Sequence, residues 1–113
     1  QVFLNLIVNS AHAIQEKQAL FQDQDGLIEI STTYDSNWVT VSIKDNGPGI
    51  PAPIHNKLFD PFFTTKEVGK GTGQGLAISY SIIVEKHKGQ LYFETVEGTG
   101  ATFYIKLPRS IDP

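Results

Sequence analysis

Hydrophobic and polar positions follow two different periods along the chain, and these periods divide it into expected helices and strands. In residues 2–20 apolar side chains recur every three or four positions, which predicts a helix. Residues 27–34 and 38–44 alternate instead and are rich in β-branched and aromatic side chains, so they predict a β-hairpin. Residues 90–96 and 101–107 alternate in the same way and predict a second hairpin.

The segment between the two hairpins carries helical and irregular patterns. Residues 52–58 predict a short helix with a proline near its first turn. Residues 76–86 are apolar on one face and lead into a basic last turn, with Gly89 as the expected C-cap. Residues 59–74 show no period, and a connection of that length in a compact domain is usually functional or disordered. Helices and strands therefore come in blocks, which predicts an α+β fold with an antiparallel or mixed sheet covered on one face by helices.

Composition and charge narrow the class of protein. A chain of 113 residues with 40% hydrophobic and 19% charged residues is expected to form one soluble globular domain over residues 1–113. A net charge of −3 argues against a nucleic-acid role, because phosphate backbones attract basic surfaces. The lack of cysteine excludes disulfides and thiolate metal sites and fits a reducing compartment. No apolar run approaches about 18 residues, so no membrane span is expected.

One polar, glycine-rich stretch, residues 45–50, follows the second strand of the first hairpin. Its two glycines let a ligand approach the backbone closely, so the stretch predicts the floor of a pocket. Asp45 has two interpretations, an Asx turn before Gly47 or an acceptor for an exocyclic amino group of a ligand. Two further glycine clusters lie at residues 69–75 and 98–100. Three such clusters in a domain of this size lead to the hypothesis that the chain clamps a nucleotide.

Two asparagines in the first expected helix, Asn5 and Asn9, lie four residues apart and therefore on one face. They are either ordinary surface residues or, if buried among apolar neighbours, groups that need partners. An amide oxygen is a hard ligand that suits Mg²⁺. His12 lies one turn beyond Asn9. None of the three histidines (His12, His55 and His87) has a histidine or cysteine at metal-ligand spacing, so no histidine metal site is predicted.

The glycine cluster at residues 69–75 leads into the helix expected at 76–86. A helix N-terminus offers free N–H groups and a positive dipole end, which favour phosphate. The pattern is not a P-loop, because Gly75 is followed by Leu76, and it is not a dinucleotide fingerprint, because no strand precedes it. A flexible linker is the alternative. Lys66, just before the cluster, is either a solvated loop lysine or a mobile cation for terminal phosphates.

Five stretches of the sequence, in order, resemble the motif boxes of the catalytic, ATP-binding domain of sensor histidine kinases. That domain belongs to the superfamily shared with DNA gyrase, MutL and the large heat-shock chaperone ATPases. The stretches are an N box (residues 4–11, LNLIVNSA), a first glycine box (45–50, DNGPGI), an F box (59–66, FDPFFTTK), a second glycine box (71–76, GTGQGL) and a glycine-Thr-Phe box (98–103, GTGATF). They cover nearly the whole chain, and five boxes in order are far more specific than one.

The resemblance implies a two-layer α/β sandwich of the Bergerat (GHKL) type. Its sheet would be mixed and mostly antiparallel, with helices on one face. A mobile ATP lid would lie between the F box and the second glycine box.

The resemblance also implies roles for individual residues in binding ATP and Mg²⁺. Asn9 would ligate Mg²⁺, and Asp45 would accept the adenine amino group. Asn5, which supports Asn9, and Lys66, which reaches the terminal phosphate, are assigned to catalysis. Gly49 and Ile50 would pack along the base with Ala13 and Thr102 nearby, and the amides around Gly71, Gly73 and Gly75 would meet the phosphates. The nucleotide-binding set is completed by Gly47, His12, Phe59, Thr65, Thr72 and Leu76.

Three departures from the family pattern accompany the resemblance. Many members carry Lys or Arg where this chain has His12, and Leu is common where it has Gln74, to which no role is assigned. The family domain usually begins with a strand and part of a helix before the N box, which are missing here. We therefore expect an N-terminally truncated domain with a shortened first helix and an open sheet edge, which favours instability or pairing between chains.

Asn5 favours a kinase over an ATPase. In the ATPase branch of the superfamily a Glu at this position orients the attacking water, whereas an amide cannot act as a general base near pH 7. The expected reaction is therefore transfer of the γ-phosphate of Mg·ATP to a histidine on a separate dimerisation domain of the parent protein. No histidine here is followed by an acidic residue, as the family's acceptor is, so this piece should not phosphorylate itself.

Other functions stay open beside the kinase. The departure at His12 motivates a degenerate nucleotide-binding regulatory module, and an ATPase fragment or a serine kinase of the anti-sigma type shares the boxes. The kinase interpretation implies a response regulator as an indirect partner, a homodimeric parent and no nucleic acid. Because Gln1 falls inside a helical pattern and no signal peptide is evident, we expect this chain to be a piece of a longer protein. The piece itself is expected to be cytoplasmic and not embedded in a membrane, although its parent protein can be membrane-anchored.

Overall fold

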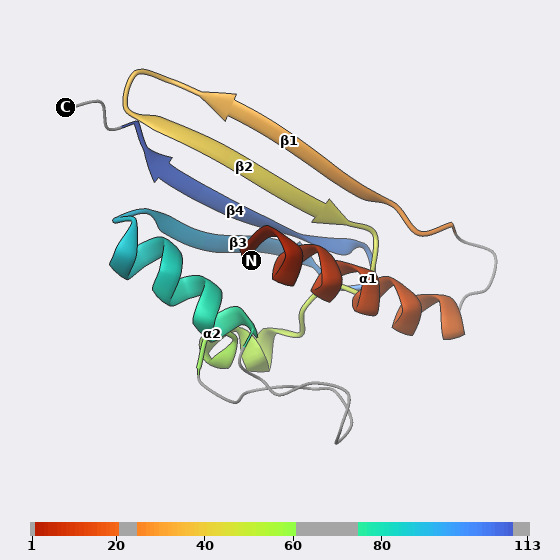
Figure 1. Ribbon diagram of the computed structural model, residues 1–113. Helices are drawn as coiled ribbons and strands as arrows, with labels where there is room; N and C mark the ends of the chain where they lie inside the picture. The colour runs from red at the N-terminus through yellow and green to blue at the C-terminus, as the bar shows by residue number, and fades with distance from the viewer. Residues whose placement is uncertain (1, 21–24, 61–74, 110–113) are drawn as a thin grey trace.

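A computed structural model describes residues 2–20, 25–60 and 75–109, with the elements in the order that the sequence predicts (Figure 1). The elements are α1 (Val2–Leu20), β1 (Ile28–Tyr34), β2 (Trp38–Asp45), the 3₁₀ helix η1 (Ala52–Lys57), α2 (Gly75–Tyr80), the π-helix η2 (Ser81–Lys86), β3 (Gln90–Val96) and β4 (Gly100–Pro108). The predicted first helix and both hairpins are confirmed, with boundaries shifted by at most one residue.

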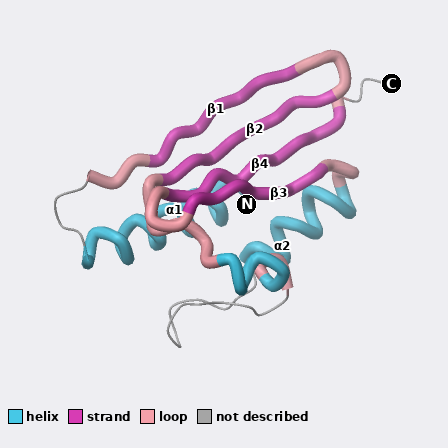
Figure 2. The backbone as a smooth tube through the Cα atoms, turned by 180° about the vertical axis from the view of Figure 1, so that it is seen from behind, coloured by secondary structure: helices cyan, strands magenta, loops and turns pink. Residues whose placement is uncertain are grey.

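The four strands form one sheet in the order β1-β2-β4-β3, and every pairing among them is antiparallel. The sequence had left open an antiparallel or a mixed sheet, and the described strands take the antiparallel form. Both figures show the helices on a single face of this sheet, so the domain has two layers (Figure 2). The predicted α+β fold is thereby confirmed.

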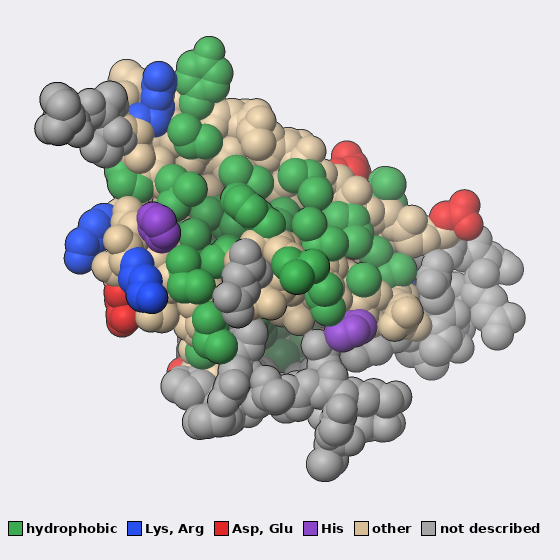
Figure 3. Space-filling view, in the orientation of Figure 1, with side chains coloured by type: hydrophobic (Ala, Val, Ile, Leu, Met, Phe, Trp, Pro, Cys, Tyr) green, Lys and Arg blue, Asp and Glu red, His purple; other side chains and the backbone are tan. Residues whose placement is uncertain are grey.

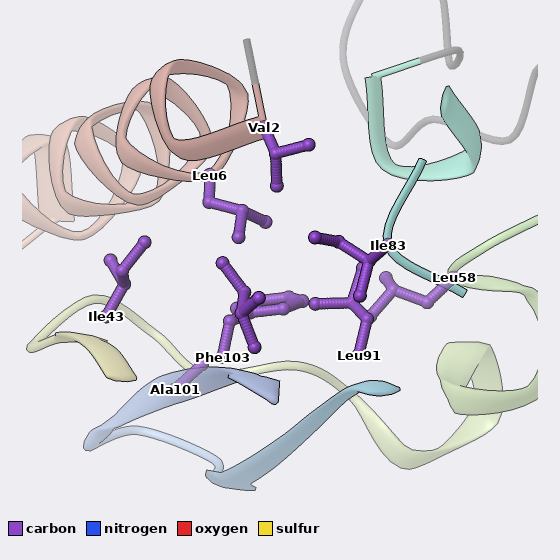
Figure 4. Packing of buried hydrophobic residues seen from close by; sticks show 9 residues of the cluster. Val2, Leu6, Ile43, Leu58, Ile83, Leu91, Ala101 and Phe103 are labelled. Atoms are coloured by element: carbon purple, nitrogen blue, oxygen red, sulfur yellow. The ribbon is translucent and has the colours of Figure 1, made fainter. Parts of the chain in front are cut away.

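The core lies between the two layers. Leu6 of α1, Ile43 of β2 and Ile105 of β4 are at most 1% exposed, and their side chains are joined by Ile83 of η2 and Phe103 of β4. Figure 4 shows Leu6 and Ile83 from the helices converging on Ile43 and Phe103 from the sheet. Inward and outward positions alternate along β4 because successive side chains of a strand point to opposite faces.

The outer edge of the sheet is open at β1. Six of the seven residues of β1 are exposed, and Ile30 and Tyr34 are 56% and 75% exposed although they face the helical side. Ile30 pairs with the buried Ile43, so it occupies an inward register position that no helix of the described chain covers. Apolar residues of α1 (Phe3, Leu4 and Val8) are also exposed, and Figure 3 shows hydrophobic side chains gathered across the middle of this face. Apolar side chains on this face thus extend beyond the part of the sheet that the described helices cover.

The second helical segment differs from the single α-helix predicted over residues 76–86. It begins as α2 and continues as the π-helix η2, which ends with the amide of His87 donating to Ile82 O at 3.1 Å. The residue with left-handed backbone at this end is Lys88 (φ 58°), not Gly89. Gly89 is needed for a different reason, because a Cβ atom there would collide with Lys106 O of β4. The prediction of Gly89 as the C-cap is therefore corrected.

Candidate nucleotide-binding site

The carboxylate of Asp45 lies at the end of β2 on the inner face of the sheet. Asp45 is 5% exposed and pairs with Ala101 of β4. Its Oδ1 accepts a hydrogen bond from the amide of Gly47 at 2.9 Å, which is the Asx turn expected from the sequence. No hydrogen bond from a described residue reaches Oδ2, so this oxygen can still accept a ligand donor. The two interpretations of Asp45 are thus compatible, since each uses a different oxygen.

Gly47 joins this loop to α1. A Cβ atom on Gly47 would lie 3.0 Å from Asp45 Oδ1 and 3.1 Å from the Cβ of Ala13. A larger residue would therefore push the loop away from the helix. Ala13 and Asp45 therefore lie against the same small residue, and the predicted place of Ala13 beside the base stays a prediction.

The glycine cluster at residues 98–100 supports the loop that follows Asp45. The amide of Gly98 donates to Pro48 O at 2.7 Å. Gly49 has left-handed backbone (φ 79°), and a Cβ atom there would lie 2.6 Å from Val96 O. The turn between β3 and β4 thus presses directly on the loop over residues 45–50, with an approach so close that Gly49 has no room for a side chain. The atoms nearest to Gly49 belong to this turn and the end of β3, and its predicted contact with a base stays a prediction.

Thr95 of β3 connects the same two segments through its hydroxyl group. Its Oγ1 accepts a hydrogen bond from the amide of Ile50 and donates one to Gly100 O, each at 2.9 Å. Ile50 O is bonded in turn to Nε2 of His55 at 2.8 Å. The backbone of Ile50 is therefore held at both its N–H and its C=O, while its side chain packs against the core.

Three polar residues predicted for the phosphate end lie on one face of α1, at positions 5, 9 and 12. The amide nitrogen of Asn5 lies 3.5 Å from Oγ of Ser79 in α2, and Ser79 is fully buried. Asn9 and His12 are half-buried. Nδ1 of His12 is buried and has no hydrogen-bond partner among the described residues. A buried ring nitrogen without a partner is costly, so His12 is a group that a ligand or water can satisfy.

Phe59 packs against aromatic residues from two other elements. Its ring centroid lies 5.1 Å from that of Tyr80 in α2 and 6.2 Å from that of Phe93 in β3. His55 contacts the same Phe93 ring edge-on at 5.0 Å. Phe59, which follows η1, therefore packs against both α2 and β3, and Leu76 at the start of α2 packs against the core.

Thr102 is not brought to the Asp45 site. It pairs with Lys44, whereas Asp45 pairs with Ala101, and neighbouring residues of a strand point to opposite faces. Because Asp45, Ala101 and Phe103 are buried on the helical side, Thr102 faces the opposite side of the sheet. The expectation that Thr102 lies near the base is corrected, and Ala101 occupies that place.

The lid residues lie outside the described residues. These are Thr65, Lys66, Gly71, Thr72 and Gly73, together with Gln74. Gly75 is described and begins α2. In the described ranges no group of three or more His, Cys, Asp or Glu side chains is placed to hold a metal ion, and none of the helices there is long and apolar enough to cross a membrane.

The sequence interpretation missed several supporting residues. Ala101 could have been found from strand alternation once Phe103 was taken as inward-facing. Thr95 and Lys17 had no local signal, because the hydroxyl and ammonium groups act on segments far away in the chain. The ammonium group of Lys17 donates to Gly98 O at 2.9 Å and to Asn46 O at 3.2 Å, and so joins α1 to both loops.

Comparison with known proteins identifies this arrangement. Residues 1–111 match the family model described as histidine kinase-, DNA gyrase B-, and HSP90-like ATPase. The chain belongs to this family. Within it, the chain is the catalytic ATP-binding domain of a sensor histidine kinase, as the relatives and solved structures below confirm.

The relatives are named as a sensor kinase and a signal transduction histidine-protein kinase. The chain is 39% identical to the sensor kinase CckA of Brucella abortus, over 99% of this chain and 12% of that protein. It is 42% identical to the signal transduction histidine-protein kinase AtoS of Escherichia coli, over 96% of this chain and 16% of that protein. The match thus spans a small part of each relative.

Solved structures share the fold. The catalytic domain of the histidine kinase ThkA, in a nucleotide-free form, is 36% identical with a TM-score of 0.77, over 96% of this chain and 65% of that one. The mycobacterial sensor histidine kinase MprB is 26% identical with a TM-score of 0.76, over 95% of this chain and 69% of that one. The GHKL type of fold predicted from the motif boxes is confirmed.

Proposed function

We propose that this domain binds ATP together with Mg²⁺ and donates the γ-phosphate to a histidine on a separate dimerisation domain of the same parent protein. The observation that carries the proposal is the buried carboxylate of Asp45. Its Oδ2 accepts no hydrogen bond from the described residues, and it lies near α1, the helix that contains Asn9. The membership of the family supports ATP as the ligand. Transfer to a histidine fits the relatives, which are named sensor and histidine kinases.

Asp45 would select adenine through its free oxygen. The exocyclic amino group of adenine is a donor and matches a carboxylate, whereas guanine presents a carbonyl acceptor at the same ring position. Two facing acceptors in a buried site would leave both groups unpaired, which costs far more than a poor fit in water. Gly47 fixes the direction of the carboxylate by bonding its other oxygen.

Asn9 would ligate Mg²⁺ at the phosphate end. It lies one helical turn before Ala13, so the base end and the phosphate end of the site are on the same helix. The Mg²⁺ ion would supply charge neutralisation on the phosphates. Asn5 would support this region from the preceding turn, where its amide contacts Ser79. The orphaned Nδ1 of His12 supports a polar ligand nearby, since such a ligand would satisfy it.

The lid residues complete the proposal. Lys66 and Thr65 would approach the terminal phosphate, and the amides of the second glycine box, which includes Gly71, Thr72 and Gly73, would cover the phosphates. Phosphoryl transfer requires mainly positioning and electrostatic stabilisation, which a lid and a metal ion provide.

The phosphate acceptor is proposed to lie in another domain. Asn5 has no proton-accepting state near pH 7, so it cannot activate a water molecule as a Glu would. The histidines of this chain are followed by Ala13, Asn56 and Lys88, and none matches an acceptor with an acidic neighbour. The proposal includes a homodimeric parent, a response regulator as the later acceptor, and a cytoplasmic location for this domain.

A nucleotide-binding regulatory module is the second candidate. It is favoured by His12, whose imidazole replaces the longer basic side chain common in the family and is only half-buried. Such a module would bind the nucleotide without transferring phosphate.

The test combines this chain with the histidine-bearing dimerisation domain of its parent protein and γ-labelled ATP in the presence of Mg²⁺. The proposal predicts label on the acceptor histidine and none on this chain alone. Tight nucleotide binding without any transfer would instead support the regulatory module. A matched mixture with the Asn5→Glu variant separates kinase from ATPase. The kinase proposal predicts little free phosphate from the unsubstituted chain and more from the variant, in which a general base is introduced, whereas an ATPase would release free phosphate without the substitution.

A further inference from the structure

The ammonium group of Lys17 joins three segments that are far apart in the sequence. From α1 it donates to Asn46 O, in the loop after β2, at 3.2 Å, and to Gly98 O, in the turn before β4, at 2.9 Å. Both acceptors are backbone carbonyl groups, so the contact depends on the fold of these loops and not on their side chains. Charged donors make stronger hydrogen bonds than neutral ones.

The two carbonyl groups flank the part of the loop that sets the position of Asp45. Asn46 is the residue after Asp45, and Gly98 holds Pro48 O through its own amide at 2.7 Å. Asn46 is itself bonded on the other side, since its Oδ1 accepts from Leu27 N at 2.9 Å. Lys17 therefore ties this loop and the supporting turn to α1 by hydrogen bonds, next to the packing of Ala13 on Gly47.

The ordinary role of such a lysine is different. A basic residue near the C-terminal end of a helix commonly lies in solvent and interacts with the helix dipole. Lys17 is half-buried and bridges two carbonyl groups that belong to other elements, which a solvated lysine does not do. No sequence motif singles it out, because the bridged groups are 29 and 81 residues away.

We infer that Lys17 is a positioning residue for adenine recognition: its ammonium group holds the Asp45 loop and the β3–β4 turn against α1. The inference rests on the proposed nucleotide function and extends it to a residue that does not contact the ligand. Loss of the ammonium group lets the carboxylate of Asp45 move relative to α1, and a small misplacement of a recognition group weakens binding strongly. The loss falls on the base end of the nucleotide and leaves the phosphate end intact.

The test compares three variants of the whole chain. Lys17→Met keeps the apolar stem and removes both hydrogen bonds, whereas Lys17→Arg keeps two donors that can reach both carbonyl groups. Lys44→Met is the matched control, because Lys44 precedes Asp45, is exposed and lies on the opposite face of the sheet. Calorimetry measures the Kd for Mg·ATP and Mg·GTP, and hydrogen exchange measures protection of the Gly98 amide in the nucleotide-free chain.

The expected result for Lys17→Met is a Kd for Mg·ATP higher by about fivefold to twentyfold, with a smaller ratio of ATP to GTP affinity. Exchange at the Gly98 amide is faster in this variant. The Kd for Mg·ATP in Lys17→Arg and in Lys44→Met stays within about twofold of the value for the unsubstituted chain. A purely structural role would lower the thermal midpoint without changing the ATP to GTP ratio, so that result overturns the inference. Unchanged affinity or unchanged Gly98 exchange in Lys17→Met also overturns it.

Two further outcomes separate this inference from the proposed function. If the unsubstituted chain binds neither nucleotide, the proposed function fails, and the inference about adenine recognition fails with it whatever the exchange data show. If the unsubstituted chain binds ATP and Lys17→Met binds it equally well, the function stands and only the inference fails. Should Lys17→Met not fold, Lys17→Gln takes its place with the same expected order of affinities, because its short amide cannot bridge both carbonyl groups.

Discussion

Asp45 and Ala101 lie opposite each other on the inner face of the sheet, in the register that pairs β2 with β4. Both are buried, and the side chain of Ala101 is a single methyl group. The next pair along, Lys44 and Thr102, points to the other face. The wall beside Asp45 is thus made by a small apolar residue and not by a hydroxyl group.

Enlarging Ala101 should therefore block the proposed base site. Ala101→Leu places additional carbons beside Asp45, and we expect the Kd for Mg·ATP to rise about tenfold or more, with a stability loss of about 1–3 kcal/mol from overpacking. Thr102→Val is the matched control on the far face, for which affinity should change by less than about twofold. Calorimetry measures the Kd for Mg·ATP in both variants. A larger loss of affinity in Thr102→Val than in Ala101→Leu would instead support the sequence-based prediction that Thr102 lies near the base.

Gly49 and Gly98 provide a paired test of the contact between the loop and the turn. Both have left-handed backbone, with φ of 79° and 84°, but only Gly49 is closely surrounded. Gly49→Ala should cost about 2–4 kcal/mol in the free energy of unfolding, because strain and a collision with Val96 O add together. Gly98→Ala meets nothing within 4 Å and should cost about 1 kcal/mol from backbone strain alone. Denaturant unfolding measures both, and equal losses would mean that the close contact at Gly49 is unimportant.

The elements could be predicted from the sequence because their signals are local. The apolar period of residues 2–20 and the alternation of both hairpins depend only on neighbours in the chain, and α1 and the four strands follow them. The α-helix predicted over 76–86 was less accurate, because residues 81–86 form a π-helix, which the apolar period does not distinguish from an α-helix. Lys88 rather than Gly89 takes the left-handed position, and Gly89 lies instead against Lys106 O of β4.

The candidate site was predictable only in part. Asp45 and its Asx turn follow from the order of residues, and the structure places Ala13 beside the same loop. Thr102 was misplaced because a one-residue difference in strand register reverses the face on which a side chain lies. The supporting contacts of Thr95 and Lys17 join segments tens of residues apart, and no local pattern encodes them.

Asn9 should matter for the metal-dependent step more than for holding the nucleotide. Asn9→Ala removes the proposed Mg²⁺ ligand, and we expect phosphotransfer to the dimerisation domain to slow by about 10–100-fold. The Kd for ADP without Mg²⁺ should change by less than about threefold, since the base end is intact. Transfer assays over a range of Mg²⁺ concentrations, with calorimetry beside them, check the two effects. Losses of equal size in binding and transfer would argue against a metal-ligand role.

The tip of the first hairpin should give the domain a pH-dependent contribution to stability at low pH. The backbone amides of Asn37 and Trp38 donate to the carboxylate of Asp35 and lower its pKa from the usual 3.8. A lowered folded-state pKa contributes stability that is present above the unfolded pKa and is lost as the pH falls through the folded value. Thermal midpoints should thus fall more steeply below about pH 4 in the unsubstituted chain than in Asp35→Asn. Parallel pH profiles for the two proteins would contradict this.

Recognition of the adenine base by Asp45 can be measured by calorimetric titration of Mg·ATP into the Asp45→Ala variant. Asp35→Ala is the control, because it removes an exposed carboxylate at the far end of β2. We expect the Kd to rise by about 10–100-fold in Asp45→Ala and to stay within about twofold of the unsubstituted chain in Asp35→Ala. An unchanged Kd in a folded Asp45→Ala variant would contradict it.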